Sequence, residues 1–156
     1  MSHKNQEKEV VMKTEKMIEA AKAPVLAYND KNWKDLWYVV DPGIVYIEVD
    51  TRKRLVGVKH FTACMQEWAT AFPDSSITVR NAYPVGSSVV LEITWRGTHS
   101  GPLESPGGTI HATGKKIDFP AMMAVEMAGE KPTAITHFYD VATLQHQLEL
   151  KAREVA

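Results

Sequence analysis

The stretch ITHFYD, residues 135–140, places a histidine that could carry a proton inside a predicted β-strand. His137 and Tyr139 share one phase of strand alternation, which we assign to the interior of the protein. Phe138 and Asp140 fall in the opposite phase, and we expect Asp140 to be structural, as a cap of the last helix. An unperturbed imidazole has a pKa of about 6.5, which suits acid–base catalysis near neutral pH. His137 is therefore the candidate for carrying a proton.

Three further polar side chains are expected to share this inward phase on other strands: Asn81, Tyr83 and His99. A buried polar group without a partner costs about 1–3 kcal/mol, so several on one apolar face indicate a wet pocket rather than a dry core. In such a pocket His99, Tyr139 or Asn81 would hydrogen-bond a bound compound.

Large apolar side chains are predicted to form the walls around these polar groups. The candidate wall residues are Trp68, Trp95, Phe119 and Met123. Apolar walls with a few placed polar groups are typical of a small-molecule site. The same residues could instead fill a core, and the sequence leaves both interpretations open.

The motifs of metal, phosphate and nucleophile sites are not found in this sequence. The histidines lack metal-ligand spacing, although a site assembled from distant strands stays open. The run GTHSG, residues 97–101, differs from the G-x-S-x-G nucleophile motif. Cys64 falls on the apolar stripe of a helix, where a free thiol behaves as a small hydrophobe. We therefore expect neither a metal nor another cofactor.

Composition favours an ordinary globular protein. The chain has 156 residues, a net charge of −1 and 44% hydrophobic residues, with no long basic run. We expect a single domain over residues 1–156, with an ordered core at about 10–150. The charge argues against nucleic acid binding, and no apolar stretch is long enough to span a membrane. The charged N-terminus indicates a cytoplasmic protein, and a lone cysteine cannot form an internal disulfide.

Helical periodicity dominates the first half of the chain and strand alternation the second. Helices are predicted over residues 10–28, 32–39 and 57–72, with Pro24 expected to kink or restart the first, and at residues 144–148. Strands are predicted at residues 44–49, 76–83, 89–99, 117–127 and 134–141, and the glycine-rich residues 100–108 as a loop. Pro120 indicates an edge position or a bulge. This order predicts an α+β fold with helices on one face of a mostly antiparallel sheet.

Four stretches of the chain resemble the SnoaL-like polyketide cyclase family. They read LVGVKHFTACMQEWATAFPDSSITV, VVLEITWRGTHSGPL, ATGKKIDFPAM and ITHFYDVATLQHQL. With the first helix they cover about residues 10–150. The resemblance implies a strongly curved, mixed but mostly antiparallel sheet wrapped round helices, which leaves a conical pocket. It also implies a homodimer formed through the sheet.

The same resemblance implies where proton transfer would occur. The acid–base carboxylate of those cyclases falls on His137 here, and a second histidine of the family falls on Met123. The arginine and two aspartates of the related limonene epoxide hydrolases are not expected, because Arg96 and Asp118 lie in the outward phase. The implied partner is a small apolar molecule of polyketide type. Two hypotheses remain. In the first, cofactor-free aldol-type cyclisation or isomerisation, His137 moves a proton alpha to a carbonyl group, and His99, Tyr139 or Asn81 hydrogen-bonds the developing enolate oxygen. The second is ligand binding without catalysis.

Overall fold

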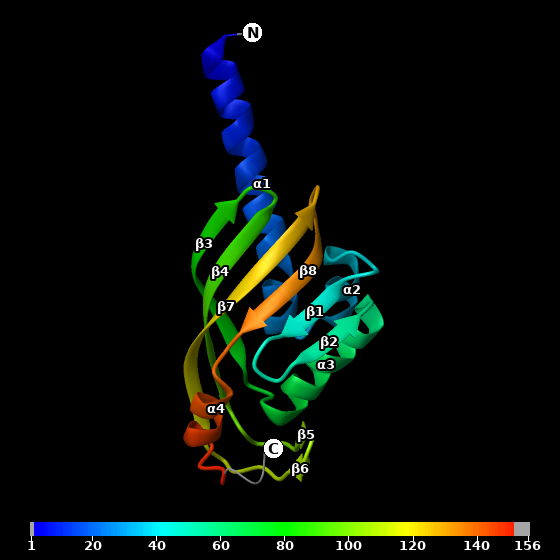
Figure 1. Cartoon of the computed structure of the whole chain (residues 1–156), viewed down its shortest axis with the longest axis vertical. Coiled ribbons are helices and arrows are strands. Elements are labelled where there is room, and N and C mark those ends of the chain that lie inside the picture. Colours follow the sequence, from blue (N-terminus) through cyan, green and yellow to red (C-terminus); the bar gives the residue numbers. More distant parts are fainter. Residues whose placement is uncertain (1, 152–156) are drawn as a thin grey trace.

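The computed structural model describes residues 2–151 and combines helices with a curved sheet (Figure 1). The helices are α1 (His3–Asn29), α2 (Trp33–Val39), α3 (Val58–Ala71) and α4 (Val141–Gln147). The strands are β1 (Val45–Glu48), β2 (Lys53–Val56), β3 (Ser76–Val85), β4 (Ser88–Thr98), β5 (Leu103–Ser105), β6 (Gly108–Ile110), β7 (Lys116–Ala128) and β8 (Lys131–Phe138). The predicted α+β class is confirmed. Three short strands differ from the prediction. Strands β5 and β6 begin within residues 100–108, which had been expected to be loop, and β2 had not been expected.

The main sheet has the strand order β2-β1-β8-β7-β4-β3. Neighbouring strands run antiparallel, except that β1 and β8 are parallel. The long strands β4 and β7 bend over their length, so that the sheet curves around the helices (Figure 1). The parallel pairing sets Tyr46 opposite Ile135 and Glu48 opposite His137. It thereby brings two segments that are distant in sequence into one site.

Strand alternation holds along β4 and β7 as predicted. Their buried members are Val89, Leu91, Ile93, Trp95, Ile117, Phe119, Ala121, Met123, Val125 and Met127. Helix α1 packs across several strands of this face, and its buried residues come from its C-terminal part. On β8 the same alternation buries His137 and leaves Phe138 exposed. The central strands therefore form the apolar floor of the molecule.

A β-bulge at Arg80 changes the phase of β3. Val79 pairs with Ile93, but Asn81 pairs with Glu92, so Arg80 has no partner residue of its own. Asn81 and Tyr83 are consequently exposed, and both donate hydrogen bonds to the Glu92 carboxylate, at 3.0 and 3.2 Å. The prediction that these two side chains face the interior is wrong, because one extra residue moves every later side chain to the other face.

Two prolines lie within regular elements. Pro120 is paired with Thr94 of β4, but the pairing of β7 with β8 begins at Met122, so Pro120 occupies an edge segment as predicted. Pro24 lies inside α1, and the helix runs on through it to Asn29 instead of restarting there.

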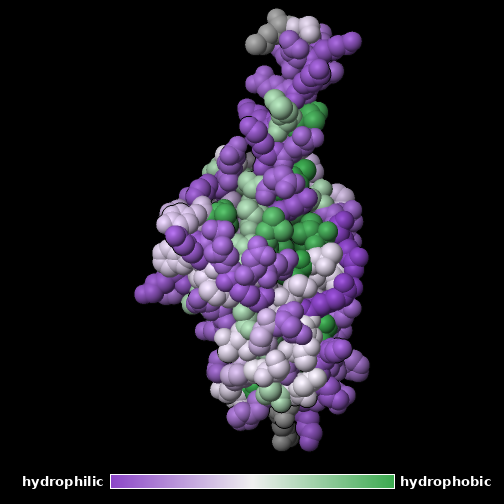
Figure 2. All heavy atoms as spheres, turned by 180° about the vertical axis from the view of Figure 1, so that it is seen from behind, coloured by the Kyte–Doolittle hydropathy of each residue, from purple (hydrophilic) through white to green (hydrophobic). Residues whose placement is uncertain are grey.

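The N-terminal part of α1 projects away from the rest of the molecule (Figure 1). The helix begins at His3, seven residues before the predicted start. Figure 2 shows the projecting part as a largely hydrophilic surface, although Val10, Val11 and Met12 are exposed there. Within residues 2–151 no helix is long and apolar enough to cross a membrane.

Candidate functional site

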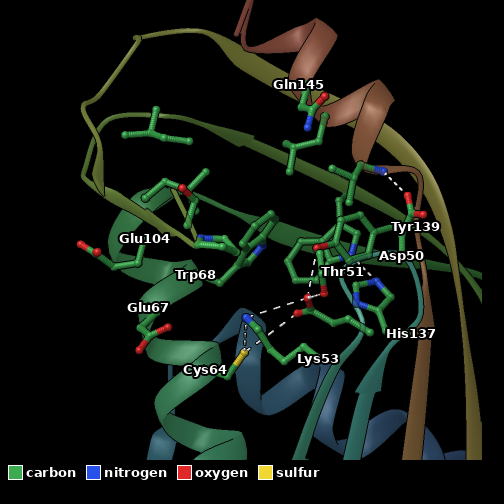
Figure 3. Close-up of a pocket in the computed structure, with 18 of the residues that line it drawn as sticks. Asp50, Thr51, Lys53, Cys64, Glu67, Trp68, Glu104, His137, Tyr139 and Gln145 are labelled. Carbon is green, nitrogen blue, oxygen red and sulfur yellow. Dashed lines mark hydrogen bonds and ion pairs between the residues drawn. The ribbon is translucent and has the colours of Figure 1, made fainter. Parts of the chain in front are cut away.

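A cavity of about 320 Å³ lies between the sheet, α3, the β5–β6 hairpin and α4 (Figure 3). Four residues predicted as pocket residues line it, and they are Trp68, Trp95, Phe119 and Tyr139. Apolar side chains from the surrounding elements complete the wall, namely Met65, Leu103, Ile110, Val141, Leu144 and Leu150. Trp68 and Trp95, which were both expected to contact a cavity, lie in the wall of this one.

The aromatic rings of the wall support one another. The ring centroid of Trp68 lies 5.6 Å from that of Trp95 in an edge-to-face arrangement, and 6.4 Å from that of Tyr139. Phe119 and Tyr139 are 6.1 Å apart. Such pairs add about 0.5–1.5 kcal/mol beyond the burial of their surface, so this part of the wall is held rigidly.

The hairpin that covers the cavity is anchored to α3 by a glycine. The backbone N–H groups of Ser100 and Gly101 both donate to the carbonyl oxygen of Ala71, each at 3.1 Å. A Cβ at Gly101 would lie 2.0 Å from the carbonyl oxygen of Thr70, so only glycine permits this close approach. The glycine thereby fixes where Leu103 and Ile110 enter the wall.

His137 lies in the cavity wall, as predicted, and both of its ring nitrogens are engaged. The side chain is 3% exposed. The Trp95 indole N–H donates to His137 Nε2 at 3.1 Å, and the Tyr46 hydroxyl lies 3.0 Å from Nδ1. Burial lowers the pKa of His137 to about 3, so the imidazole is neutral at physiological pH. The neighbouring Tyr139 makes a ring contact with His137, with 4.8 Å between the centroids.

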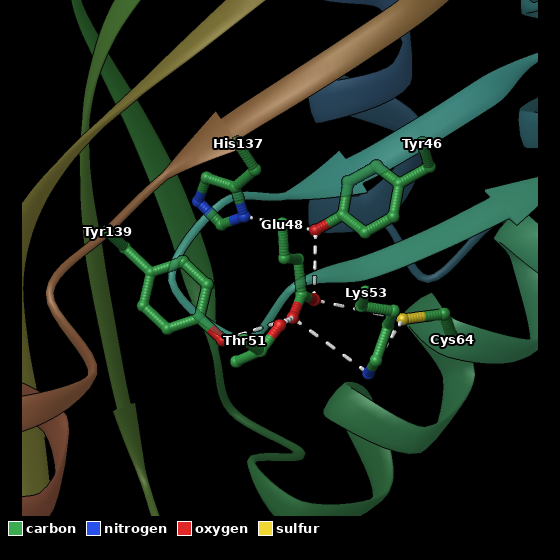
Figure 4. Close-up of polar contacts among 7 residues, drawn as sticks. All are labelled: Tyr46, Glu48, Thr51, Lys53, Cys64, His137 and Tyr139. Atoms are coloured by element: carbon green, nitrogen blue, oxygen red, sulfur yellow. Dashed lines mark hydrogen bonds and ion pairs between the residues drawn. The ribbon is translucent and has the colours of Figure 1, made fainter.

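Glu48 is the buried carboxylate of the cavity and was not predicted. It is 7% exposed, and three hydroxyl groups surround it (Figure 4). Tyr46 donates to Oε1 at 3.2 Å. Thr51 and Tyr139 donate to Oε2 at 2.7 and 3.2 Å. Burial, and then the neighbouring Glu48 charge, raise the pKa of both tyrosines, which therefore remain hydroxyl donors.

Lys53 supplies a positive charge beside this carboxylate. Its Nζ lies 3.9 Å from Glu48 Oε2 and 3.7 Å from Cys64 Sγ, contacts that are long for an ammonium group (Figure 4). Burial acts to lower the pKa of Lys53, but the charges of Glu48 and its neighbours raise it above its ordinary value. Lys53 is therefore a cation that retains donor capacity toward the cavity.

Cys64 contacts the polar cluster without being reactive. Burial raises the pKa of its thiol to about 11, so at neutral pH almost none of it is the nucleophilic thiolate. This agrees with the inert, buried cysteine expected from the helical stripe.

His99 and Met123 are buried, as their phase predicts, but neither lines the cavity. His99 Nδ1 accepts the backbone N–H of Thr113 at 3.2 Å and lies 3.0 Å from its hydroxyl oxygen. Its ring packs against Phe72, and burial lowers its pKa. Met123 is paired with His137 across the sheet and belongs to the core. Of the two histidines predicted to act together, the cavity contains only His137.

Carboxylates prevail among the charged side chains near the mouth of the cavity. Asp50, Glu67 and Glu104 line it together with Glu48, and Lys53 is the lysine of the set (Figure 3). Within residues 2–151 no three His, Cys, Asp or Glu side chains are arranged to hold a metal ion. Arg96 and Asp118 form an exposed ion pair at 3.0 Å, outside the cavity as expected.

Asp140 begins α4 as the predicted cap. Its carboxylate accepts the backbone N–H of Ala142 and the hydroxyl of Thr143, both at 2.9 Å.

We expect Asp140→Ala to lower the free energy of unfolding by about 0.5–2 kcal/mol, as the loss of a helix cap does. Urea denaturation would measure the change. Stability equal to that of the wild-type protein would show that these bonds contribute nothing.

Comparison with known proteins gives a family and a fold. The family model described as SnoaL-like polyketide cyclase matches residues 18–148. A SnoaL-like polyketide cyclase, described as putative, from Jannaschia sp. CCS1 has a similar structure, with a TM-score of 0.78 at 18% identity over 89% of this chain and 95% of that one. No curated protein matches the sequence.

Two further solved structures share the fold. An LEH-like epoxide hydrolase from M. tuberculosis matches with a TM-score of 0.68 at 15% identity, over 87% of this chain and 91% of that one. TerC, co-crystallised with polyporic acid, matches with a TM-score of 0.69 at 15% identity, over 86% of this chain and 98% of that one. At these identities the similarity establishes the curved-sheet fold and leaves the chemistry to the residues of the cavity.

Proposed function

Since this chain belongs to the SnoaL-like polyketide cyclase family, we propose that its cavity binds a small, largely apolar carbonyl compound and moves a proton on it without a cofactor. The reaction class is aldol-type cyclisation or isomerisation. The apolar wall and the volume of about 320 Å³ support a compact ligand of polyketide type. TerC, a protein of the same fold, was crystallised with polyporic acid, which supports an organic ligand of this kind.

One observation carries the proposal, namely the position of Glu48. Glu48, a residue that is 7% exposed, places its carboxylate at the polar end of a cavity whose wall is largely apolar. Lys53 Nζ is 3.9 Å from it and can donate to a second atom in the cavity. A base next to a cationic donor is the pair that enolisation of a carbonyl compound requires.

The proton transfer can be written on these two residues. A Glu48 oxygen takes the proton from the carbon alpha to the carbonyl group, the C–H bond breaks, and its electron pair moves onto the carbonyl oxygen. The Lys53 ammonium group donates a hydrogen bond to the enolate oxygen that results. The enolate carbon then attacks a second carbonyl carbon of the same molecule, which closes a ring, and the oxygen of that second carbonyl group takes the proton back from Glu48. Alternatively the enolate accepts the proton back at another position, which isomerises the compound.

The geometry favours Glu48 over His137 as the base. His137 Nε2 already accepts the Trp95 N–H, and burial lowers the pKa of the ring to about 3. A base with that pKa at neutral pH would be weak, and its lone pair is directed at protein and not at the cavity. We therefore propose Glu48 for the role that the family resemblance had placed on His137.

Deuterium exchange tests the proposal without knowledge of the natural substrate. Purified protein is incubated in D₂O with a panel of apolar aryl ketones and 1,3-diketones, and mass spectrometry follows deuterium at the alpha carbon. We expect at least one compound to exchange faster than in buffer alone. Compounds that bind in the cavity, yet exchange only at the buffer rate, would contradict the proposed catalysis.

Ligand binding without catalysis is the second candidate. One observation favours it, namely that both Glu48 oxygens already accept hydrogen bonds from hydroxyl groups. A carboxylate so fully bonded could serve only to order the cavity. Binding of the panel compounds with no exchange would support this function.

We further propose that two copies associate through the outer face of the sheet. The outward phase includes apolar side chains on adjacent strands, namely Val90, Ala124, Met122 and Phe138, whereas Thr94, which shares this phase, is polar and buried. Met122 and Phe138 are cross-strand partners and are 42% and 47% exposed. Apolar groups that are exposed together often mark an interface. Light scattering should give twice the chain mass of 17.4 kDa, and 17.4 kDa throughout the micromolar range would contradict the proposal.

A further inference from the structure

Four buried polar side chains on the sheet form a continuous chain of hydrogen bonds that ends at the Glu48 carboxylate. Trp95 on β4, His137 on β8, and Tyr46 and Glu48 on β1 follow one another at 3.1, 3.0 and 3.2 Å. None of the four residues is more than 7% exposed. Water therefore does not compete for these bonds in the folded protein, and each group depends on its neighbour in the chain.

The two ends of this chain fix the direction of every bond in it. An indole N–H can only donate, and an ionised carboxylate can only accept. His137 must therefore accept at Nε2, which leaves the proton of the neutral ring on Nδ1. Nδ1–H then donates to the Tyr46 oxygen, and the Tyr46 hydroxyl donates to Glu48 Oε1. The reverse direction would set the Trp95 N–H against a protonated Nε2.

We propose that His137 is a positioning residue, locked by Trp95 as the neutral Nδ1–H tautomer, which aims the Tyr46 hydroxyl at Glu48. The imidazole keeps its proton throughout and does not exchange it with a ligand. Trp95 thus has a second role besides forming the wall, because its N–H selects the tautomer. The inference depends on the proposed function only for its consequence in catalysis, since the tautomer of His137 is a property of the unliganded protein.

Two hydroxyl groups and one lysine in the cavity also lie against Glu48, at the end of this series of hydrogen bonds. Thr51 and Tyr139 donate to the other Glu48 oxygen, and Lys53 lies 3.9 Å from it. Among the described contacts, Thr51, Tyr139 and Lys53 make no hydrogen bond to the His137 ring, whose closest ring neighbour is Tyr139 at 4.8 Å between centroids. The state of His137 is therefore set by Trp95 and Tyr46.

Nitrogen NMR of the histidine-labelled protein tests the lock directly. Long-range ¹H–¹⁵N correlations distinguish the two neutral tautomers from each other and from the cation. For the wild-type protein we expect Nδ1–H at His137, unchanged from about pH 8 to about pH 5, where an ordinary histidine titrates. An Nε2–H tautomer, or titration of His137 within this range, would overturn the proposal.

Trp95→Phe and Trp68→Phe form a matched pair of variants for the same measurement. Trp95→Phe keeps an aromatic ring but removes the donor to Nε2, so we expect the single Nδ1–H signal to be lost in favour of mixed tautomers. Trp68 lines the same cavity, but its indole N–H is buried without a hydrogen-bond partner. Trp68→Phe should leave the His137 signal as it is. If both variants keep the pure tautomer, the indole N–H does not select it.

Substitution of His137 by asparagine distinguishes a positioning role of this residue from a role in proton transfer. His137→Asn retains an N–H donor near the place of Nδ1 but has no group that titrates. If His137 positions Tyr46, His137→Asn should exchange deuterium faster than His137→Ala on any compound that the wild-type protein turns over. If His137 carries the proton, both variants should lose turnover to the same extent. The NMR result stands even where no compound exchanges, so failure of the lock and failure of the proposed function are distinguishable.

Discussion

Glu48→Gln is expected to slow alpha-carbon deuterium exchange by about 10²–10⁴-fold, the range for loss of a general base. Glutamine has the size of glutamate, and its oxygen can still accept one of the hydroxyl hydrogen bonds. It cannot take up the proton, and it removes the negative charge beside Lys53. The rate should therefore fall while the compound still binds. Exchange by mass spectrometry, with affinity by calorimetry, separates the two effects.

Glu67→Gln is the control for this result. Glu67 lines the mouth of the same cavity from α3 but is exposed to solvent. This substitution changes the net charge by the same amount and leaves the Glu48 cluster in place, so exchange should stay close to the wild-type rate. An equal loss in both variants would mean that the cavity needs negative charge in general and has no specific base at Glu48.

Trp95→Ala is expected to lower the free energy of unfolding by about 3–5 kcal/mol, as truncation of a large buried aromatic side chain does. Trp95 is 1% exposed and packs edge-to-face against Tyr28 at 5.3 Å and Trp68 at 5.6 Å. The variant also leaves His137 Nε2 without its donor. The residue is thus both cavity wall and core, the two alternatives that the sequence had left open. Urea denaturation with linear extrapolation measures the loss.

Trp37→Ala provides the reference for that measurement. Trp37 lies on α2 and is 46% exposed, so its removal should change stability by about 0.5 kcal/mol or less, as most surface substitutions do. A loss below about 1 kcal/mol for Trp95→Ala would contradict its place in the core and would indicate that the cavity wall tolerates collapse.

The fold could be predicted from the sequence wherever the strands keep their alternation. On β4, β7 and β8 the period of two assigned Trp95, Phe119 and His137 to the interior correctly. On β3 the bulge at Arg80 reverses which side chains face the interior, and no residue type near it indicates a bulge. Parity arguments therefore apply only up to the first irregularity of a strand.

The candidate site was only half predictable for a related reason. Tyr46 and Glu48 share a phase with buried Ile44, so the alternation that was applied to His137 would also have turned them inward. The signal was present, but a glutamate in a short strand is ordinarily taken as exposed. Lys53 could not have been assigned, because β2 was not predicted. Which strands pair depends on contacts distant in sequence, and the parallel pairing of β1 with β8 is what sets Glu48 opposite His137.

A crystal structure with a bound, slowly reacting 1,3-diketone tests the central claim most directly. We predict that the acidic carbon of the ligand lies within about 3–3.5 Å of a Glu48 carboxylate oxygen, as a near-attack geometry requires. One ligand oxygen should accept a hydrogen bond from Lys53 Nζ, and Trp95 should still donate to His137 Nε2. A ligand whose acidic carbon lies against His137 Nε2, with the Trp95 hydrogen bond broken, would contradict the assignment of Glu48 as the base.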